Sequence, residues 1–350
     1  MATDLLDRRS FLKNAALGLG ITACSFGKSF ASQRAHYVGV ETDALDRSRL
    51  VYFSPTGASL GSTRLDFRAH GMAENGDRLI VFPRRPGNRF AVVQTGELQV
   101  LSTVQAPANR HFFGHGAFTK DGNFLIVPEN DMDTLQGAVA IYEIKPALRR
   151  MGTITLPGPG PHEVVRHPNS DVFFIALGGL ETHPDYGRDP LNADSFQSQI
   201  LRYDFHKGSV EPLGLWPGTE RVSLRHLAFD GLGRLYVGGQ VPTLTKEAVP
   251  VLWLVTERGA QALETGPDLA NYVSSVAADG NRALISSKQS GTVLELNGAD
   301  VIQKSRLTGA SALALKDGHA VKSGFHLLEM GSAKHSVQQG YEFDNHGIML

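Results

Sequence analysis

The chain has 350 residues, 41% hydrophobic and 20% charged, and this composition excludes an intrinsically disordered protein. Its 34 Lys and Arg residues nearly balance its 35 Asp and Glu residues. It therefore lacks the basic surplus of a nucleic-acid binder, and we expect no nucleic-acid partner. A single Cys excludes a disulfide framework and a Cys-ligated zinc or iron–sulfur site, and the 38 Gly and 17 Pro residues indicate a fold rich in turns.

The N-terminal segment has the pattern of an export signal. The adjacent Arg8 and Arg9 precede a short, weakly hydrophobic run over residues 14–23, which is typical of a twin-arginine signal peptide. Because this run is too short to cross a bilayer as a helix, we expect no membrane span. The competing interpretation, an amphipathic N-terminal helix, accounts for fewer of these features.

Two cleavage sites compete in this segment. Ser29-Phe30-Ala31 has the small-x-small pattern of ordinary signal peptidase, whereas residues 21–24 resemble a lipobox that would leave a lipidated Cys24. We favour cleavage after Ala31, because Ile is a less usual start for a lipobox. The expected organisation is a signal peptide over residues 1–31 and one mature domain over residues 32–350, located in the periplasm.

The mature chain repeats a unit of short strands joined by tight turns. In most copies an Asn-Gly or Asp-Gly pair separates two hydrophobic runs, as at Asn75-Gly76, which is the pattern of a β-hairpin. The five clearest copies begin at His70, His115, His162, His226 and Ser275. Their first residues lie 45, 47, 64 and 49 residues apart, and the longest interval contains an insertion over residues 181–197. A sixth, degenerate copy passes Asp317-Gly318.

A period in the forties predicts the architecture. Several short antiparallel strands per repeat at this spacing are typical of a β-propeller with one four-stranded blade per repeat. The 319 residues after the favoured cleavage site (350 minus 31) accommodate about seven such blades. We therefore predict an all-β, single-domain β-propeller of seven four-stranded blades. An array of immunoglobulin-like sandwiches is the alternative, but it would not need a recurring Asp-Gly turn at this period.

The repeats also predict a ring of histidines. In a propeller the innermost strand of each blade starts at one rim of the central channel, so equivalent residues of successive blades converge there. Imidazole binds iron, copper, zinc and nickel, and we expect a divalent or ferric metal ion as cofactor. The candidate metal ligands are His70, His115, His162 and His226. The alternative is that each His bonds the backbone of the neighbouring blade as a structural latch.

Further polar residues are predicted around this ring. The loops after the second strand of each blade leave on one face, and arginines there suit a carboxylate-rich or phosphate-like ligand, which Arg binds bidentately. The candidate ligand-binding residues are Arg84, Arg85, Arg110, His111, Glu129, Glu163, His183, Arg188, Arg225 and Gln240. A lone residue such as Arg188 is more simply interpreted as a solvated loop charge. The sequence contains no phosphate-loop or His-Glu-x-x-His motif, and we assign no catalytic residue.

Several stretches of the chain carry a resemblance to a known family. They cover residues 82–87, 110–116, 129–131, 160–163, 178–184 with 187–192, and 223–227. On these motifs the chain resembles the twin-arginine-exported domain-of-unknown-function family 1513 over essentially its whole mature length. Pro128 departs from the pattern, because Thr is expected before Glu129. The resemblance implies a periplasmic propeller, often encoded beside imelysin-type iron-uptake proteins, and it brings no established activity.

Three functions are compatible with these observations. The first is a periplasmic binding or accessory protein of iron acquisition, which holds a metal ion, a ferric chelate or a partner among the periplasmic iron-uptake proteins. The second is a lactonase-like hydrolase with a metal-activated water, for which Glu129 and Glu163 are the only acidic candidates. The third is an interaction scaffold with structural histidines. We favour the first and expect a monomer, although the fold alone does not choose among the three.

Overall fold

The described part of the chain falls within one unit that runs from residue 34 to residue 350. The computed structural model describes residues 36–145, 147–187, 189–214, 216, 218–243, 245 and 247–350. The expected signal peptide, both of its cleavage sites and the candidate Arg188 lie outside the described residues. Within the described ranges no helix is long and apolar enough to cross a membrane. The helices given for these ranges are two 3₁₀ turns, η2 (Pro184–Tyr186) and η3 (Gly266–Leu269).

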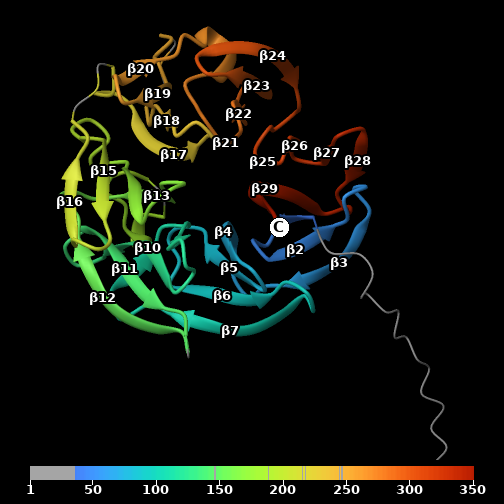
Figure 1. The fold of residues 1–350 in the computed structure, drawn as a ribbon, viewed down its shortest axis with the longest axis horizontal. Helices are drawn as coiled ribbons and strands as arrows, with labels where there is room; N and C mark the ends of the chain where they lie inside the picture. The colour runs from blue at the N-terminus through green and yellow to red at the C-terminus, as the bar shows by residue number, and fades with distance from the viewer. Residues whose placement is uncertain are drawn as a thin grey trace, which may run out of the picture. The chain divides into compact units, whose positions relative to one another are not determined.

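Seven antiparallel sheets follow one another around a ring (Figure 1), and the inner position of each is taken by one strand or, in one blade, by two short strands. In ring order the inner strands are β29 (Tyr341–Met349), β4 (Ala69–Asn75), the pair β8 (Arg110–Phe112) and β9 (Ala117–Phe118), β13 (Pro161–Arg166), β17 (Ser223–Phe229), β21 (Ser275–Asp279) and β25 (Leu313–Lys316). The second strands are β1 (Tyr37–Asp43), β5 (Arg78–Pro83), β10 (Phe124–Asp131), β14 (Val172–Leu177), β18 (Leu235–Gln240), β22 (Arg282–Ser287) and β26 (His319–Ser323).

Two further strands complete each blade. The third strands are β2 (Ser48–Phe53), β6 (Arg89–Gln94), β11 (Gly137–Glu143), β15 (Gln199–Asp204), β19 (Leu252–Thr256), β23 (Thr292–Asn297) and β27 (Leu327–Met330). The outer strands are β3 (Ser59–Arg64), β7 (Gln99–Gln105), β12 (Arg149–Thr155), β16 (Ser209–Pro212), β20 (Gly259–Ala262), β24 (Asp300–Arg306) and β28 (Ala333–Ser336). The predicted all-β propeller of seven four-stranded blades is confirmed.

Local sequence explains the hairpins, and burial explains the core. The turn at Asn75-Gly76 joins β4 to β5, and Gly76 has a φ of 64°, a conformation that a two-residue hairpin turn requires and that Gly adopts freely. Second strands such as β5 are buried along almost their whole length because neighbouring blades cover both of their faces. Large rings fill the space between blades, as Phe82, Phe90 and Phe112 do with centroids 5.2 to 5.8 Å apart.

The ring is closed by the two ends of the described chain. The C-terminal strand β29 pairs with β1 near the start, with Tyr37 opposite Met349 and Thr42 opposite Glu342. Six blades follow the six sequence repeats, and the seventh is assembled from β29 together with β1, β2 and β3. This closure brings one more inner strand to the centre than the repeats indicate.

Candidate functional site

The four predicted histidines lie where the inner strands depart from regular pairing. The departures are register shifts in β4, β13 and β17 and the gap between β8 and β9. They fall at residues 69–72, 161–164, 224–226 and 113–116. The inner strands β21 and β25 contain no His and pair with β22 and β26 without a shift. Because a β-bulge changes the direction of a side chain, and bulges are common beside functional sites, the irregularities point to a built site.

A fifth histidine, His346, joins the cluster, and the sequence prediction missed it. It lies on β29, where the pairing with β1 shifts between Gly39 and Glu41. Like the other four histidines, it therefore lies where an inner strand departs from regular pairing. No Asn-Gly or Asp-Gly hairpin turn marks this strand in the sequence. The signal that could have found it is the His-Gly pair His346-Gly347, which repeats the pairs that begin at His70 and His115.

The five imidazoles pack closely at the centre of the ring. The ring centroids of His70 and His346 are 4.5 Å apart, those of His115 and His346 4.7 Å, and those of His70 and His115 5.0 Å. His162 lies 5.0 Å from both His115 and His226. Three imidazoles that bind one metal ion at ~2.1 Å have centroids roughly 5 Å apart, so these separations suit metal ligation.

Glycines beside the histidines make this packing possible. A Cβ atom on Gly114, whose φ is 99°, would lie 2.5 Å from Cδ2 of His70. A Cβ atom on Gly71 would lie 2.8 Å from Nδ1 of His115 and 2.4 Å from the carbonyl oxygen of Gly114. Any larger residue at either position would displace the imidazole beside it.

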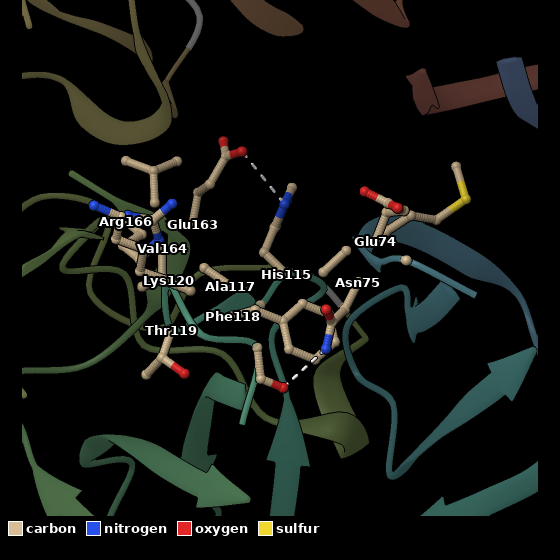
Figure 2. A pocket seen from close by; sticks show the side chains of 16 residues that line it. Glu74, Asn75, His115, Ala117, Phe118, Thr119, Lys120, Glu163, Val164 and Arg166 are labelled. Atoms are coloured by element: carbon tan, nitrogen blue, oxygen red, sulfur yellow. Dashed lines mark hydrogen bonds and ion pairs between the residues drawn. The ribbon is translucent and has the colours of Figure 1, made fainter. Parts of the chain in front are cut away.

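Glu163 adds a carboxylate to the cluster. Its Oε2 lies 3.2 Å from Nδ1 of His226 and accepts a hydrogen bond of 3.1 Å from the Leu227 N–H. Its Oε1 lies 3.6 Å from Nδ1 of His115, the contact drawn as a dashed line in Figure 2. Burial raises the pKa of Glu163, while His115 and the Leu227 N–H act in the opposite direction. The carboxylate therefore lies between two imidazoles.

The histidines are held in their neutral form. Burial lowers the pKa of His115 and of His226 to about 3. It also places the pKa values of His70, His162 and His346 well below the usual 6.5. Positive charge adds to this effect, because Arg225 lowers the pKa of His162 and His226, and Arg84 lowers that of His70 and His346. Neutral imidazole is the form that binds a metal ion.

Two overlapping groups have their ligand atoms close enough to share an ion. His115, His162, Glu163 and His226 each offer one ligand atom within 4.8 Å of the others, and so do His70, His115 and His346. Several buried ring nitrogens have no hydrogen-bond partner among the described residues, namely Nδ1 of His70, Nε2 of His115, Nδ1 of His162 and Nε2 of His346. Such atoms call for an explanation, and a metal ion would satisfy them.

A pocket of about 460 Å³ leads to this cluster from one face of the ring. Its walls come from β4, β9 and β13 and from the turns after β4 and β9, and His115 and Glu163 line it (Figure 2). Asn75, Lys120 and Arg166 also line it. The pocket therefore gives small molecules a route to two of the candidate ligands.

Three of the predicted arginines lie near the cluster or the loops around it. Arg225 is buried on β17 directly before His226. Arg84 donates to Oδ1 of Asp344 at 3.5 Å, and Arg85 donates to the Thr182 hydroxyl at 3.5 Å, with its guanidinium 5.8 Å from the centroid of the Phe113 ring.

Several other predicted residues make their contacts away from the central cluster. Glu129 is fully buried and accepts hydrogen bonds from Arg110 at 2.9 Å and from Arg150 at 2.6 Å, so it ties β10 to β8 and β12. Gln240 donates to the carbonyl of Val273 at 3.2 Å.

Two predicted histidines lie outside the central cluster. His183 caps η2, where its Nδ1 accepts from the Asp185 N–H at 3.2 Å. Burial lowers the pKa of His111, and the charge of His183 adds to that effect. The structure thus brings together the four predicted histidines and Glu163, whereas Arg110, Glu129, His183 and Gln240 make contacts elsewhere.

Fold and site together define a seven-bladed β-propeller with a buried polyhistidine cluster at its centre. Over residues 63–350 the chain matches the family described as "Protein of unknown function (DUF1513)", and it belongs to that family. This membership confirms the resemblance carried by the sequence motifs. No curated protein matches the chain.

Solved structures share the fold. The structure titled "Kuenenia stuttgartiensis Hydrazine Synthase" is similar with a TM-score of 0.62 and 14% identity, over 87% of this chain and 96% of that one. A functionally unknown protein from Desulfotomaculum acetoxidans DSM 771 is similar with a TM-score of 0.61 and 14% identity, over 89% and 98% of the two chains. At this identity the likeness shows the propeller fold alone.

Proposed function

We propose that this protein is an exported metal-binding propeller of iron acquisition that holds a transition-metal ion on His115, His162, Glu163 and His226. The observation that carries the proposal is the convergence of neutral, buried imidazoles on one carboxylate. If the histidines were purely structural, each ring nitrogen would form a hydrogen bond with a backbone group of the next blade. Instead, several nitrogens are buried with no hydrogen-bond partner within the described ranges, and each costs about 1–3 kcal/mol if nothing binds it.

The ligand set favours a metal ion of intermediate softness. Imidazole suits iron, copper, zinc and nickel, and a carboxylate shifts the preference toward the harder ions. Three imidazoles with Glu163 therefore accommodate Fe(II) or Fe(III), and the iron-uptake setting implied by the family resemblance makes iron the first candidate. Periplasmic location and cooperation with periplasmic iron-uptake proteins are part of the same proposal.

Positive charge near the cluster favours an anionic co-ligand on the metal. Arg84 and Arg225 lie close enough to lower the pKa values of four of the histidines. Positive charge beside a metal ion weakens its binding, and Asp344, which pairs with Arg84 at 3.5 Å, offsets only part of it. A carboxylate-rich ferric chelate would bring further negative charge to the metal.

Elemental analysis tests the proposal. The protein is exported through its own signal, purified without added metal and measured by mass spectrometry for iron, copper, zinc and nickel. We expect about one iron ion per chain, and a loss of tenfold or more in Glu163→Gln and His226→Gln. His206→Gln, at a histidine whose side chain is 72% exposed, is the matched control and should keep the metal. Wild-type protein that contains none of these metals and binds none on titration would refute the proposal.

A metal-dependent hydrolase is the second candidate, and the pocket favours it. A water molecule on a metal held by Glu163 and His115 would be reachable through the space of about 460 Å³, and metal coordination turns water into a nucleophile near neutral pH. Turnover of lactone or aryl-ester substrates by the metal-loaded wild type, lost in Glu163→Gln, would establish it. Metal binding without such turnover leaves the binding function.

A further inference from the structure

We infer that the cluster binds a second metal ion on His70, His115 and His346, so that the propeller holds a two-metal centre with His115 shared between the ions. This inference rests on the proposed function, because it adds an ion to the site described there. It concerns a different set of ligands, since only His115 belongs to both groups.

The three imidazoles form a compact triangle. Their centroids are 4.5, 4.7 and 5.0 Å apart, and their planes meet at 87°, 85° and 80°. One ring nitrogen of each lies within 4.8 Å of the others. Nearly perpendicular rings do not stack on one another, and ligand atoms this close together can be bound by one ion.

Each of these three rings has a buried nitrogen without a hydrogen-bond partner among the described residues. Nδ1 of His70, Nε2 of His115 and Nε2 of His346 are all buried, and none finds a hydrogen-bond partner in the described part of the chain. Three orphaned nitrogens on three neighbouring rings are improbable in a purely structural core, because each destabilises the fold. A single ion would satisfy all three.

His115 has one nitrogen for each ion. Its Nδ1 lies 3.6 Å from Oε1 of Glu163, on the side of the first group. Its Nε2 is the nitrogen without a partner. When both nitrogens bind metal, the neutral ring releases its one N–H proton to solvent and bridges the ions as an imidazolate. Each metal–nitrogen bond then uses one ring lone pair, and no oxidant or reductant is needed.

The backbone is shaped for this triangle. Gly71 and Gly114 leave the space that the rings of His115 and His70 occupy, and a Cβ atom on Gly347 would lie 1.8 Å from the hydroxyl oxygen of Tyr37. His346 reaches the centre only because β29 closes the ring against β1. The ligand set consists of ring nitrogens alone, two from neutral imidazoles and one from the bridging imidazolate of His115, which suits copper or zinc better than a hard cation.

Copper loading of the full mature chain tests the inference. Metal-free protein is titrated with Cu(II) alone, the bound copper is counted by mass spectrometry, and the electron paramagnetic resonance signal is integrated. We expect two ions per chain in the wild type, with a spin count below two because the shared imidazolate couples the ions. His346→Gln and His70→Gln should each bind one ion with a full spin, His226→Gln should also bind one, and His206→Gln should bind two.

The outcomes separate this inference from the proposed function. One ion per chain in the wild type, lost in Glu163→Gln, would overturn the second site and leave the first. No bound ion would overturn both. Two ions that persist in His346→Gln and in His70→Gln would place the second ion elsewhere and also overturn the inference. A cooperative thermal melt of each metal-free variant shows that the variant is folded. If His346→Gln, in the closing strand β29, does not fold, His70→Gln tests the same site.

Discussion

Acidification should destabilise the metal-free protein through its central histidines. In the native state burial lowers the pKa values of His115 and His226 to about 3, whereas an unfolded chain protonates histidine near pH 6.5. Below pH 6.5 the unfolded state therefore binds more protons than the native state. Proton binding therefore lowers the free energy of the unfolded state more than that of the native state. The free energy of unfolding decreases as the pH falls from 6.5 toward 3.

The size of the effect follows from these two pKa values. Each such histidine lowers the free energy of unfolding by ~1.4 kcal/mol per pH unit once the pH is below about 6.5. Between pH 7 and pH 5 this amounts to ~2 kcal/mol for each of His115 and His226, or ~4 kcal/mol together. Glu163, whose pKa is raised in the native state, binds one proton more readily there than in the unfolded chain. Its protonation therefore increases the free energy of unfolding as the pH falls and offsets part of this loss. A loss of this size is large against the ~5–15 kcal/mol by which folded proteins are stable.

Urea denaturation of the chelator-treated protein at half-unit steps from pH 7 to pH 5 measures this loss. His226→Gln removes one of the titrating rings, and its loss over the same range should be smaller than that of the wild type by ~2 kcal/mol. The exposed control His206→Gln should follow the wild type. A wild-type stability that does not change between pH 7 and pH 5, or an equal loss in His226→Gln, would refute the assignment of buried neutral imidazoles.

Metal binding, glycine packing and the export signal give three other predictions. Metal in hundredfold excess over its Kd should add ~2.7 kcal/mol of stability, and His115→Ala should remove most of the rise in melting temperature. The rise should persist from pH 7 to pH 5, because the pKa values of His115 and His226 in the native state are about 3 and the ligands stay neutral. Gly114→Ala should lower the free energy of unfolding by at least ~1–3 kcal/mol in chemical denaturation, because the new methyl group meets the ring of His70 2.5 Å away; an unchanged stability would contradict the close packing. Replacing Arg8 and Arg9 together by Lys should leave the protein in the cytoplasm, and cell fractionation that still finds it in the periplasm would contradict the export signal.

The architecture and most of the central cluster could be predicted from the sequence because their signals are local and periodic. A turn such as Asn75-Gly76 fixes its hairpin through its own backbone preferences. A propeller repeats one supersecondary unit, so residues at one position of the repeat meet at the axis whatever their distance along the chain. His70, His115, His162 and His226 share that position, and the structure brings all four together.

His346 could not be predicted in this way. Its strand β29 forms no hairpin with a strand that follows it, because its partner β1 lies at the other end of the described chain. The pairing of two distant strands leaves no turn residues and no period to detect. The pair His346-Gly347 resembles those at His70 and His115, but it is the closure of the ring that brings the fifth imidazole beside them.

The two acidic candidates show what tertiary structure alone decided. Glu129 and Glu163 are alike in the sequence, since each lies in a short motif beside a predicted strand. Regular pairing along β10 directs Glu129 to Arg110 and Arg150, where it stabilises one blade. The irregular pairing at residues 161–164 brings Glu163 to His115 and His226. The direction of a strand side chain depends on cross-strand register and on bulges, and these are set by the partner strands rather than by the residue's own neighbours in sequence.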